Sequence, residues 1–261
     1  MLSDKEIWTM MLNDAFVDNT YDDISKEYVI SIYRKDWKHV MNNYKKIKKN
    51  KNDIFLIVIA YADNVDIIKF IIDKFNVDIN YCNKFGNNCL IIACWKNERI
   101  EIITYITIVL QIDKNHTNHD DDNCLTYACR GNENLEIIKY FVDTKMDVKR
   151  CNKNGTNNLI QACFMNKNER IIKYLHQECK IDIKYVDKLN NCCLSVACHR
   201  NKNVKIIEYL INEHKITDFN EKQKYMILAL DNKNIEVCSY VLKQYLTEHS
   251  ILTNLTQKRY K

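Results

Sequence analysis

The sequence predicts an all-α protein built as a helical-repeat solenoid, and three observations support this fold class. Four consecutive segments align with one another, beginning at Asn87, Asp122, Thr156 and Asn191, so that their starting points are 35, 34 and 35 residues apart. Each segment carries two apolar stretches with helical spacing. The 261 residues include no proline and only 3 glycines. That composition disfavours an all-β sandwich, which needs turn residues roughly every 8–12 positions.

The first stretch of each unit predicts a helix with one closely packed face. Leucine, alanine and cysteine occupy its first, fourth and fifth positions, which lie on one stripe of a helix. Because alanine and cysteine are small, they let neighbouring helices approach closely. The stripe recurs in all four units as Leu90, Ala93, Cys94; Leu125, Ala128, Cys129; Leu159, Ala162, Cys163; and Leu194, Ala197, Cys198.

The second stretch predicts another helix, marked by two isoleucines and an aromatic residue. It reads Ile102, Ile103 and Tyr105 in the first aligned unit and recurs in the three that follow. A related unit precedes the four, from Phe55, and another follows them, from Met226. The sequence therefore predicts about six helix-pair repeats of 34–35 residues.

A polar turn separates successive units. Asparagine or aspartate opens each turn, and glycine, aspartate or asparagine closes it, which are residues that bond their own backbone or tolerate a left-handed conformation. The turns are Asn83–Gly86, Asn118–Asp121, Asn152–Gly155 and Asp187–Asn190.

These motifs resemble the ankyrin repeat over about residues 54–245. The family pattern Thr-Pro-Leu-His-x-Ala-Ala appears here in altered form, as in the Asn88-Cys89-Leu90-Ile91 segment followed by Ala93 and Cys94. Since the usual proline and histidine are absent, we expect asparagine to cap the first helix and the turns to be looser. The Asn-Cys-Leu-x-x-Ala-Cys version and the richness in Asn, Ile and Lys resemble divergent ankyrin-repeat proteins of mimivirus-like giant viruses.

The chain is predicted to have three parts. Residues 1–50 do not match the repeat and read as a helical N-terminal cap, with helices over 25–34 and 36–47. Residues 51–247 form the repeat array, and residues 248–261 a closing helix with a basic tail. The N-terminus lacks a signal-peptide pattern, and the longest apolar run is too short to span a bilayer. We therefore expect an intracellular, cytoplasmic protein, in the host cytoplasm if it is viral, with reduced cysteines and no membrane partner.

Two clusters offer metal-binding side chains, and for neither do we favour metal binding. The cysteines recur in repeat register, which indicates packing rather than zinc ligation. The segment from His116 to Asp122 combines imidazoles with carboxylates, but it coincides with the turn between two repeats and the other turns hold nothing similar, so we interpret it as a solvated turn. We find no catalytic motif and predict no enzymatic activity, no catalytic or metal-ligating residue and no cofactor. A metal-dependent or enzymatic regulator using the Cys/His-rich repeats stays open as an alternative.

A basic segment is the only sequence feature that points to nucleic acid. Residues 34–51 hold eight basic residues and one acid, with aromatic Trp37 and Tyr44 among them. The whole chain carries a net charge of only +5, from 39 basic and 34 acidic residues. We therefore interpret the segment as the charged outer face of the cap and regard a nucleic-acid partner as the weaker hypothesis.

The resemblance implies a scaffold that binds a protein partner, as a monomer by default, through a concave face and the turn tips. A host or viral protein would be the partner of a viral scaffold, and an adaptor role for a ubiquitin ligase is the family alternative. The two residues after each Ala-Cys pair vary between units while their neighbours repeat, which is typical of a binding face. The alternative for Trp95 and Phe164 is that they fill packing gaps. The predicted partner-binding residues are Trp95, Lys96, Arg130, Phe164, Met165, His199 and Arg200, with the tips Phe85, His119 and Leu189.

Overall fold

The computed structural model describes residues 2–13 and 22–246, and their regular structure is helical. An isolated bridge joins Cys151 to Asn157, and no strand occurs within the described ranges. The all-α repeat fold predicted from the sequence is thus confirmed. Backbone contacts divide the chain into two compact units, residues 1–128 with 136–146 and residues 129–135 with 147–261. The proposed closing helix and tail, 248–261, lie outside the described residues.

The first unit begins with helices that precede the repeats. They are α1 (Asp4–Asn13), α2 (Asp23–Tyr33), α3 (Trp37–Asn43) and the short 3-10 helix η1 (Tyr44–Lys46). Side chains of Asp22 and Asp36 cap α2 and α3 by accepting from the backbone N–H groups of Ser25 and His39, at 2.7 and 3.0 Å. The helices expected over 25–34 and 36–47 are therefore present, whereas α1 has no counterpart in the sequence prediction. Assigning residues 1–50 to a cap stays a prediction.

The repeats follow as helix pairs. In the first unit they are α4 (Lys51–Tyr61) with α5 (Val65–Phe75) and α6 (Cys89–Lys96) with α7 (Ile100–Thr104) and η2 (Tyr105–Val109). Helix α8 (Cys124–Gly131) spans the division, and α9 (Leu135–Asp143) follows it. The second unit holds α10 (Asn158–Met165) with α11 (Glu169–Lys173) and η3 (Tyr174–Glu178), α12 (Cys193–Arg200) with α13 (Val204–His214), and α14 (Phe219–Leu230) with a helix over 235–246.

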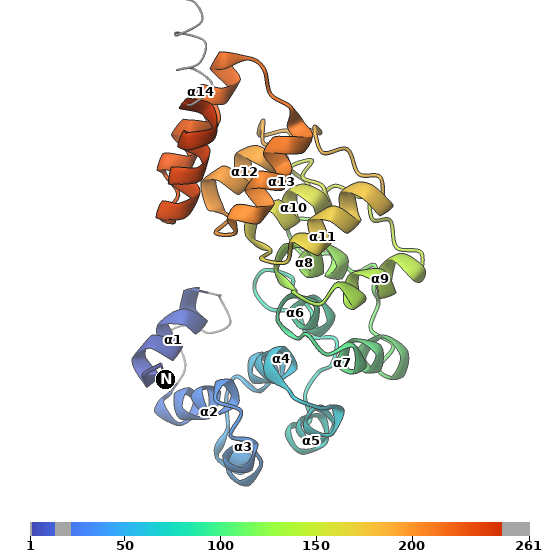
Figure 1. The fold of residues 1–261 in the computed structure, drawn as a ribbon. Coiled ribbons are helices and arrows are strands. Elements are labelled where there is room, and N and C mark those ends of the chain that lie inside the picture. Colours follow the sequence, from blue (N-terminus) through green and yellow to red (C-terminus); the bar gives the residue numbers. More distant parts are fainter. Residues whose placement is uncertain (1, 14–21, 247–261) are drawn as a thin grey trace, which may run out of the picture. The chain divides into compact units, whose positions relative to one another are not determined.

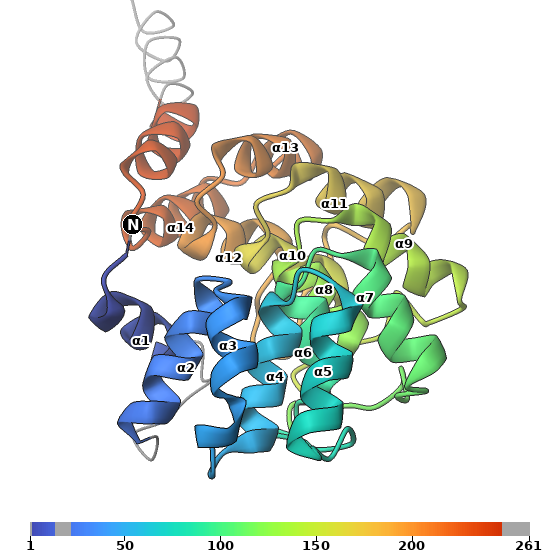
Figure 2. The same ribbon diagram turned by 90° about the horizontal axis from the view of Figure 1, so that it is seen from below.

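The first helices of successive pairs stack on one another. Helix α4 contacts α6 in the first unit, and α12 contacts both α10 and α14 in the second (Figures 1 and 2). The predicted stripe of leucine, alanine and cysteine lies on helices α6, α8, α10 and α12 of this stack. Every member of that stripe, from Leu90 to Cys198, has no exposed surface. The small residues thus allow the close packing of neighbouring helices that the sequence pattern predicts.

Ala128 supplies a direct test of that close packing. It lies on α8 at the alanine position of the stripe and is fully buried. Replacing Ala128 with leucine should lower the free energy of unfolding by about 1–3 kcal/mol, because the added methylenes must be forced into a filled helix interface. Urea denaturation followed by circular dichroism measures this, and a midpoint equal to that of the wild type would contradict it.

Two of the aligned repeats are 35 residues long, and they share a feature that the 34-residue repeat between them lacks. Their second helices, α7 and α11, each run into a π-helical turn, η2 or η3. In the 34-residue repeat between them, the second helix is the regular helix α9. A π turn takes up an extra residue within a helix. The unequal repeat lengths therefore leave the spacing of the helix pairs intact.

Candidate partner-binding surface

The four turns between successive repeats, which we call fingers, are closed by hydrogen bonds. In the finger that Asn83 opens, its Oδ1 accepts from the N–H groups of Phe85 (3.0 Å) and Asn87 (3.1 Å). Backbone hydrogen bonds from Asn83 to Asn87 and from Gly86 to Asn83 close the same loop. The fingers opened by Asn118, Asn152 and Asp187 repeat this arrangement. The side chain that opens each turn thus supplies hydrogen bonds in place of the absent proline and histidine network, and whether the turns are looser than usual stays a prediction.

The residue that closes each finger has a positive φ, as expected from its type. The values are 80° and 73° for Gly86 and Gly155, and 64° and 60° for Asp121 and Asn190. Just beyond the fingers, asparagine caps the first helices, as the sequence predicted. The side chains of Asn88, Asn123 and Asn157 each accept a backbone N–H at 2.9 Å, and Cys192 replaces them in α12 with a longer contact to its sulfur.

Neighbouring fingers are joined within each unit. In the first, the N–H of His119 donates to the carbonyl of Phe85 at 3.0 Å, and the His116 ring lies 2.8 Å from the carbonyl of Gly86. In the second, the N–H of Lys188 donates to Asn154 at 3.0 Å. The hydroxyl of Tyr185 takes the place of the His116 ring and donates to the carbonyl of Gly155 at 2.8 Å. His116 thus has a structural role at its position.

The fingers hold their tips in solvent. Phe85 is 41% exposed, Leu189 is 63% exposed and the neighbouring Val186 is 47% exposed, while the predicted tip His119 is also exposed. These apolar side chains stand on backbone that is fixed by the hydrogen bonds just described. A surface of this kind can lose little further entropy when another protein covers it.

The predicted residues at the ends of the first helices are partly buried against the following repeat. Trp95 makes an edge-on contact with Tyr127, with ring centroids 5.6 Å apart, and the Lys96 ammonium lies 4.2 Å from the Trp95 ring centroid. Arg130 occupies the equivalent place and donates through Nε to the side-chain oxygen of Gln161 at 2.8 Å. Trp95 therefore has a packing role, whatever it does for a partner.

The remaining predicted residues divide into two groups. Phe164 and His199 are half-buried, whereas Met165 is 50% exposed and Arg200 is exposed. In the first unit, Tyr127 connects the helix end to the fingers, because its hydroxyl accepts from the side chain of Asn118 at 3.2 Å. Trp95 and the finger that carries His119 thus share one neighbour, so these two parts of the predicted face adjoin.

Sequence reasoning missed a buried ladder of asparagines, one after each first helix from α6 to α14. Asn166 donates through Nδ2 to the carbonyls of Cys129 and Asn132, at 2.9 and 2.8 Å, and its Oδ1 accepts from the N–H of Asn168 at 2.8 Å. Each such asparagine therefore ties its own loop to the helix end of the preceding repeat. The same pair of donations is made by Asn97, Asn201 and Asn232.

Cys238 ends this ladder. Its thiol lies against the carbonyls of Ala229 and Asn232, which is the pair that the asparagine of a further repeat would take. The signal for the ladder was present in the sequence as an asparagine four residues after each alanine of the stripe.

The cysteines are free thiols, and most are buried. Cys89 and Cys124 donate to backbone carbonyls ten residues earlier, those of Ile79 and Lys114, at 3.5 and 3.3 Å. Burial raises the pKa of Cys89 to about 12 and also raises the pKa of Cys198. Since metal ligation and nucleophilic attack need the thiolate, these thiols are poorly suited to either. Within the described ranges, no three Cys, His, Asp or Glu side chains gather as a metal-sized group.

Several charged side chains of the basic segment, residues 34–51, form contacts within the protein. Asp63 receives the Lys35 ammonium at 2.6 Å and the Trp37 indole N–H at 2.8 Å, and it also pairs with Arg99 at 3.1 Å. Burial alone would raise the pKa of Asp63, but these hydrogen bonds more than offset that effect and hold the pKa below its ordinary value. Arg34 pairs with Asp4. The segment thus fastens α3 to the loop that follows α4.

Over the part of the chain that the structure describes, we find no helix of the length and apolar character that a membrane crossing requires.

Comparison with protein families places the repeats. A family model described as "Ankyrin repeats (3 copies)" matches residues 97–187 and 164–251, and one described as "Ankyrin repeats (many copies)" matches residues 56–106. No curated protein matches the chain. The two models cover the array of helix pairs, the fingers between them and the helix ends described above. The chain belongs to the ankyrin-repeat family.

Proposed function

We propose that the protein is a non-enzymatic scaffold that binds a protein partner through its finger tips and the adjoining ends of its first helices. Ankyrin repeats generally mediate protein–protein interactions. The observation that carries the proposal is the exposure of Phe85 and Leu189 on fingers that are closed by hydrogen bonds to the opening side chain, with the exposed Val186 next to the second of these fingers. Exposed apolar side chains on a rigid turn are explained by a partner that covers them.

The partner and its location form the finer part of the proposal. We place the protein as a monomer in the cytoplasm of a cell infected by a giant virus, with a host or viral protein as its partner. This part is supported by the Asn-Cys-Leu-x-x-Ala-Cys version of the repeat and by the bias towards Asn, Ile and Lys. The alternative of a metal-dependent or enzymatic regulator is disfavoured by the raised pKa of the buried thiols.

Leu189→Asp tests the finger surface. We expect it to weaken partner binding at least about tenfold, since it places a charge where an apolar tip is to be covered, while the melting temperature stays near that of the wild type. The measurement is affinity capture from extracts of the source cells, quantified by mass spectrometry.

A matched control is Ile235→Asp, which makes the same chemical change at a residue that is 75% exposed and lies at the start of the helix over 235–246. It should capture the same proteins as the wild type. If both variants capture the wild-type set in full, the finger surface does not bind a partner. Trp95→Ala is a less suitable probe, because it also removes the contact with Tyr127.

A further inference from the structure

The contacts that the basic segment makes within the protein use only part of its charge. Arg34 pairs with Asp4, and Lys35 pairs with Asp63. Four lysines further along the segment are exposed and make no ion pair within the described residues. They are Lys38, Lys45, Lys46 and Lys48, which we call the lysine row. The proposed scaffold function does not use this row.

The lysine row follows the exposed side of α3 and η1. Lys38 lies in the first turn of α3, and Lys45 lies seven residues later in η1. Seven residues are about two helical turns and about 10 Å along the axis, so these two side chains leave the same face. Lys46 ends η1, and Lys48 lies two residues beyond it. The four ammonium groups are thus spread along about 10–20 Å of the surface.

An aromatic cluster holds the backbone beneath the row in place. The Tyr44 ring lies edge-on to the Phe70 ring with centroids 5.5 Å apart, and its centroid is 6.2 Å from that of Phe75. The N–H of Ile47 donates to the carbonyl of Tyr44 at 3.1 Å, and the Ile47 side chain is buried. The lysines therefore project from a fixed turn, whereas the neighbouring aromatic ring is already packed against other side chains.

The one acid of the basic segment does not neutralise the row. Asp36 caps α3 by accepting from the N–H of His39 at 3.0 Å. Even when its charge is counted against the row, three of the four positive charges stay uncompensated. Lys49 is exposed as well, but it lies near enough to Asp22 to interact with its carboxylate, so it does not belong to the row. The net charge of this surface is therefore positive.

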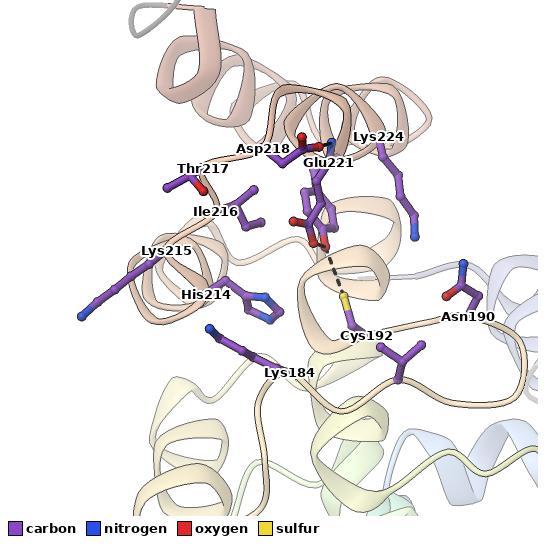
Figure 3. Close-up of a pocket in the computed structure, with 12 residues that line it drawn as sticks. Lys184, Asn190, Cys192, His214, Lys215, Ile216, Thr217, Asp218, Glu221 and Lys224 are labelled. Atoms are coloured by element: carbon purple, nitrogen blue, oxygen red, sulfur yellow. Dashed lines mark hydrogen bonds between the residues drawn. The ribbon is translucent and has the colours of Figure 1, made fainter.

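The cavity beside the finger that carries Leu189 shows the difference that carboxylates make. Its volume is about 320 Å³, and Lys184 and Lys224 face it (Figure 3). Asp218 and Glu221 also belong to its wall, so these charges balance. That cavity favours no anion, whereas the lysine row does.

We propose that the lysine row binds the phosphate backbone of a nucleic acid without reading its base sequence. Double-stranded DNA carries one negative charge for about every 1.7 Å of its axis, so every lysine of the row can lie beside a phosphate. A protein partner would have to gather several carboxylates over the same length. A membrane would need a second, apolar contact, but Val40 and Ile47 beside the row are buried, and of their apolar neighbours Met41 alone is exposed. The inference goes beyond the proposed function and does not depend on it.

The salt dependence of binding tests the proposal. The full chain is titrated into a fluorescein-labelled DNA duplex of about 24 base pairs, and fluorescence anisotropy is followed from about 50 to 200 mM NaCl. Four phosphate contacts predict a slope of about −3.6 for log K against log[salt], or a loss on the order of a hundredfold over this range. A second duplex of unrelated sequence should bind within about twofold. A slope shallower than about −1, or a preference of about tenfold for one sequence, would overturn the proposal.

Lys46→Gln combined with Lys48→Gln is the decisive variant. Both side chains are exposed, so the melting temperature should stay near that of the wild type, while the slope should become shallower by about 2. Lys202→Gln combined with Lys233→Gln is the matched control, because it removes the same charge from two exposed lysines of the second unit. The control should keep the wild-type slope. Equal slopes in the two double variants would mean that the row has no special part in binding, and would refute the proposal.

Two other polyanions distinguish the class of partner. Vesicles rich in phosphatidylserine, and poly-L-glutamate, are titrated at the same concentration of charge as the duplex and at the same salt. We expect the duplex to bind at least about tenfold more tightly than either. Equal or tighter binding of the vesicles would assign the row to a membrane surface, and equal or tighter binding of poly-L-glutamate would assign it to an acidic protein. Either result overturns the proposal.

Discussion

Asn201→Asp should lower the free energy of unfolding by about 3–5 kcal/mol near pH 8, although it changes a single atom type in the side chain. Asn201 is 1% exposed, and its Nδ2 donates to the carbonyls of Cys163 and Asn166, both at 3.0 Å. A carboxylate has no donor for these oxygens and places a buried negative charge beside them. The loss should appear as a lower urea midpoint.

The cost should depend on pH with a definite sign. The new carboxyl is destabilised in its charged form when the protein is folded, so its folded pKa lies above its unfolded pKa. Relative stability is then fully present below the unfolded pKa and is lost as the pH rises through the folded pKa. Denaturation of Asn201→Asp at several pH values from 5 to 8, each compared with the wild type, should show the smallest deficit at the lowest pH. A deficit that is constant with pH would mean that water reaches the site.

Asn203→Asp is the matched control. Asn203 lies two residues further on and is the N-cap of α13, where its Oδ1 accepts from the N–H of Lys205 at 3.0 Å. Its Nδ2 donates at the exposed surface to the carbonyl of Lys167. Aspartate is a good N-cap and its charge suits a helix N-terminus, so this substitution should cost no more than about 1 kcal/mol. Equal losses in the two variants would show that the buried ladder has no special weight.

Gly86→Ala should destabilise the protein by about 2–4 kcal/mol, the second largest effect that we expect. Gly86 has a φ of 80°, and a Cβ placed there would lie 2.9 Å from Cδ2 of His119, 3.1 Å from its backbone nitrogen and 3.2 Å from the Cα of Asn118. Backbone strain and a collision with the next finger therefore act together. The change in free energy is measured by urea denaturation.

Gly155→Ala separates these two causes. Gly155 has a similar φ of 73°, but its closest neighbour would be the flexible Cγ of Lys188 at 3.1 Å, with the nearest backbone atom at 3.4 Å. This variant should therefore lose only the backbone part, about 1–2 kcal/mol. If it loses as much as Gly86→Ala, the contact between neighbouring fingers contributes nothing to the difference.

The sequence was most informative where a residue type has one physical use. Fully buried alanines and cysteines, asparagine caps and left-handed turn closers could all be predicted, because periodicity and local backbone chemistry determine them. Helix α1 and the π turns left no such signal. The candidate surface was predicted from residue positions within the repeat. The contact between Trp95 and Tyr127 depends on how successive repeats pack, which the sequence of one repeat does not determine.

The asparagine ladder and the position of His214 are features that a comparison of the repeats with one another could have found. Asparagine recurs four residues after alanine, and an invariant polar residue within a repeat indicates a bond to the neighbouring copy. His214 breaks a pattern that Phe75 sets at the end of α5. Both features are visible in the sequence, yet only the structure shows that the asparagines and His214 are buried.

The thiol of Cys238 determines how an array of this kind can change in length. Inside the second unit, every rung offers the same amide above and the same pair of carbonyls below, so a complete helix pair could be deleted or duplicated between Asn166 and Asn232 and the new neighbours would still match. Beyond α14 the carbonyls of Ala229 and Asn232 are already occupied by sulfur. Tandem duplication is thus compatible with the ladder in the interior, whereas at this end the Cys238 side chain has to turn away or be replaced before a further asparagine can bind these carbonyls.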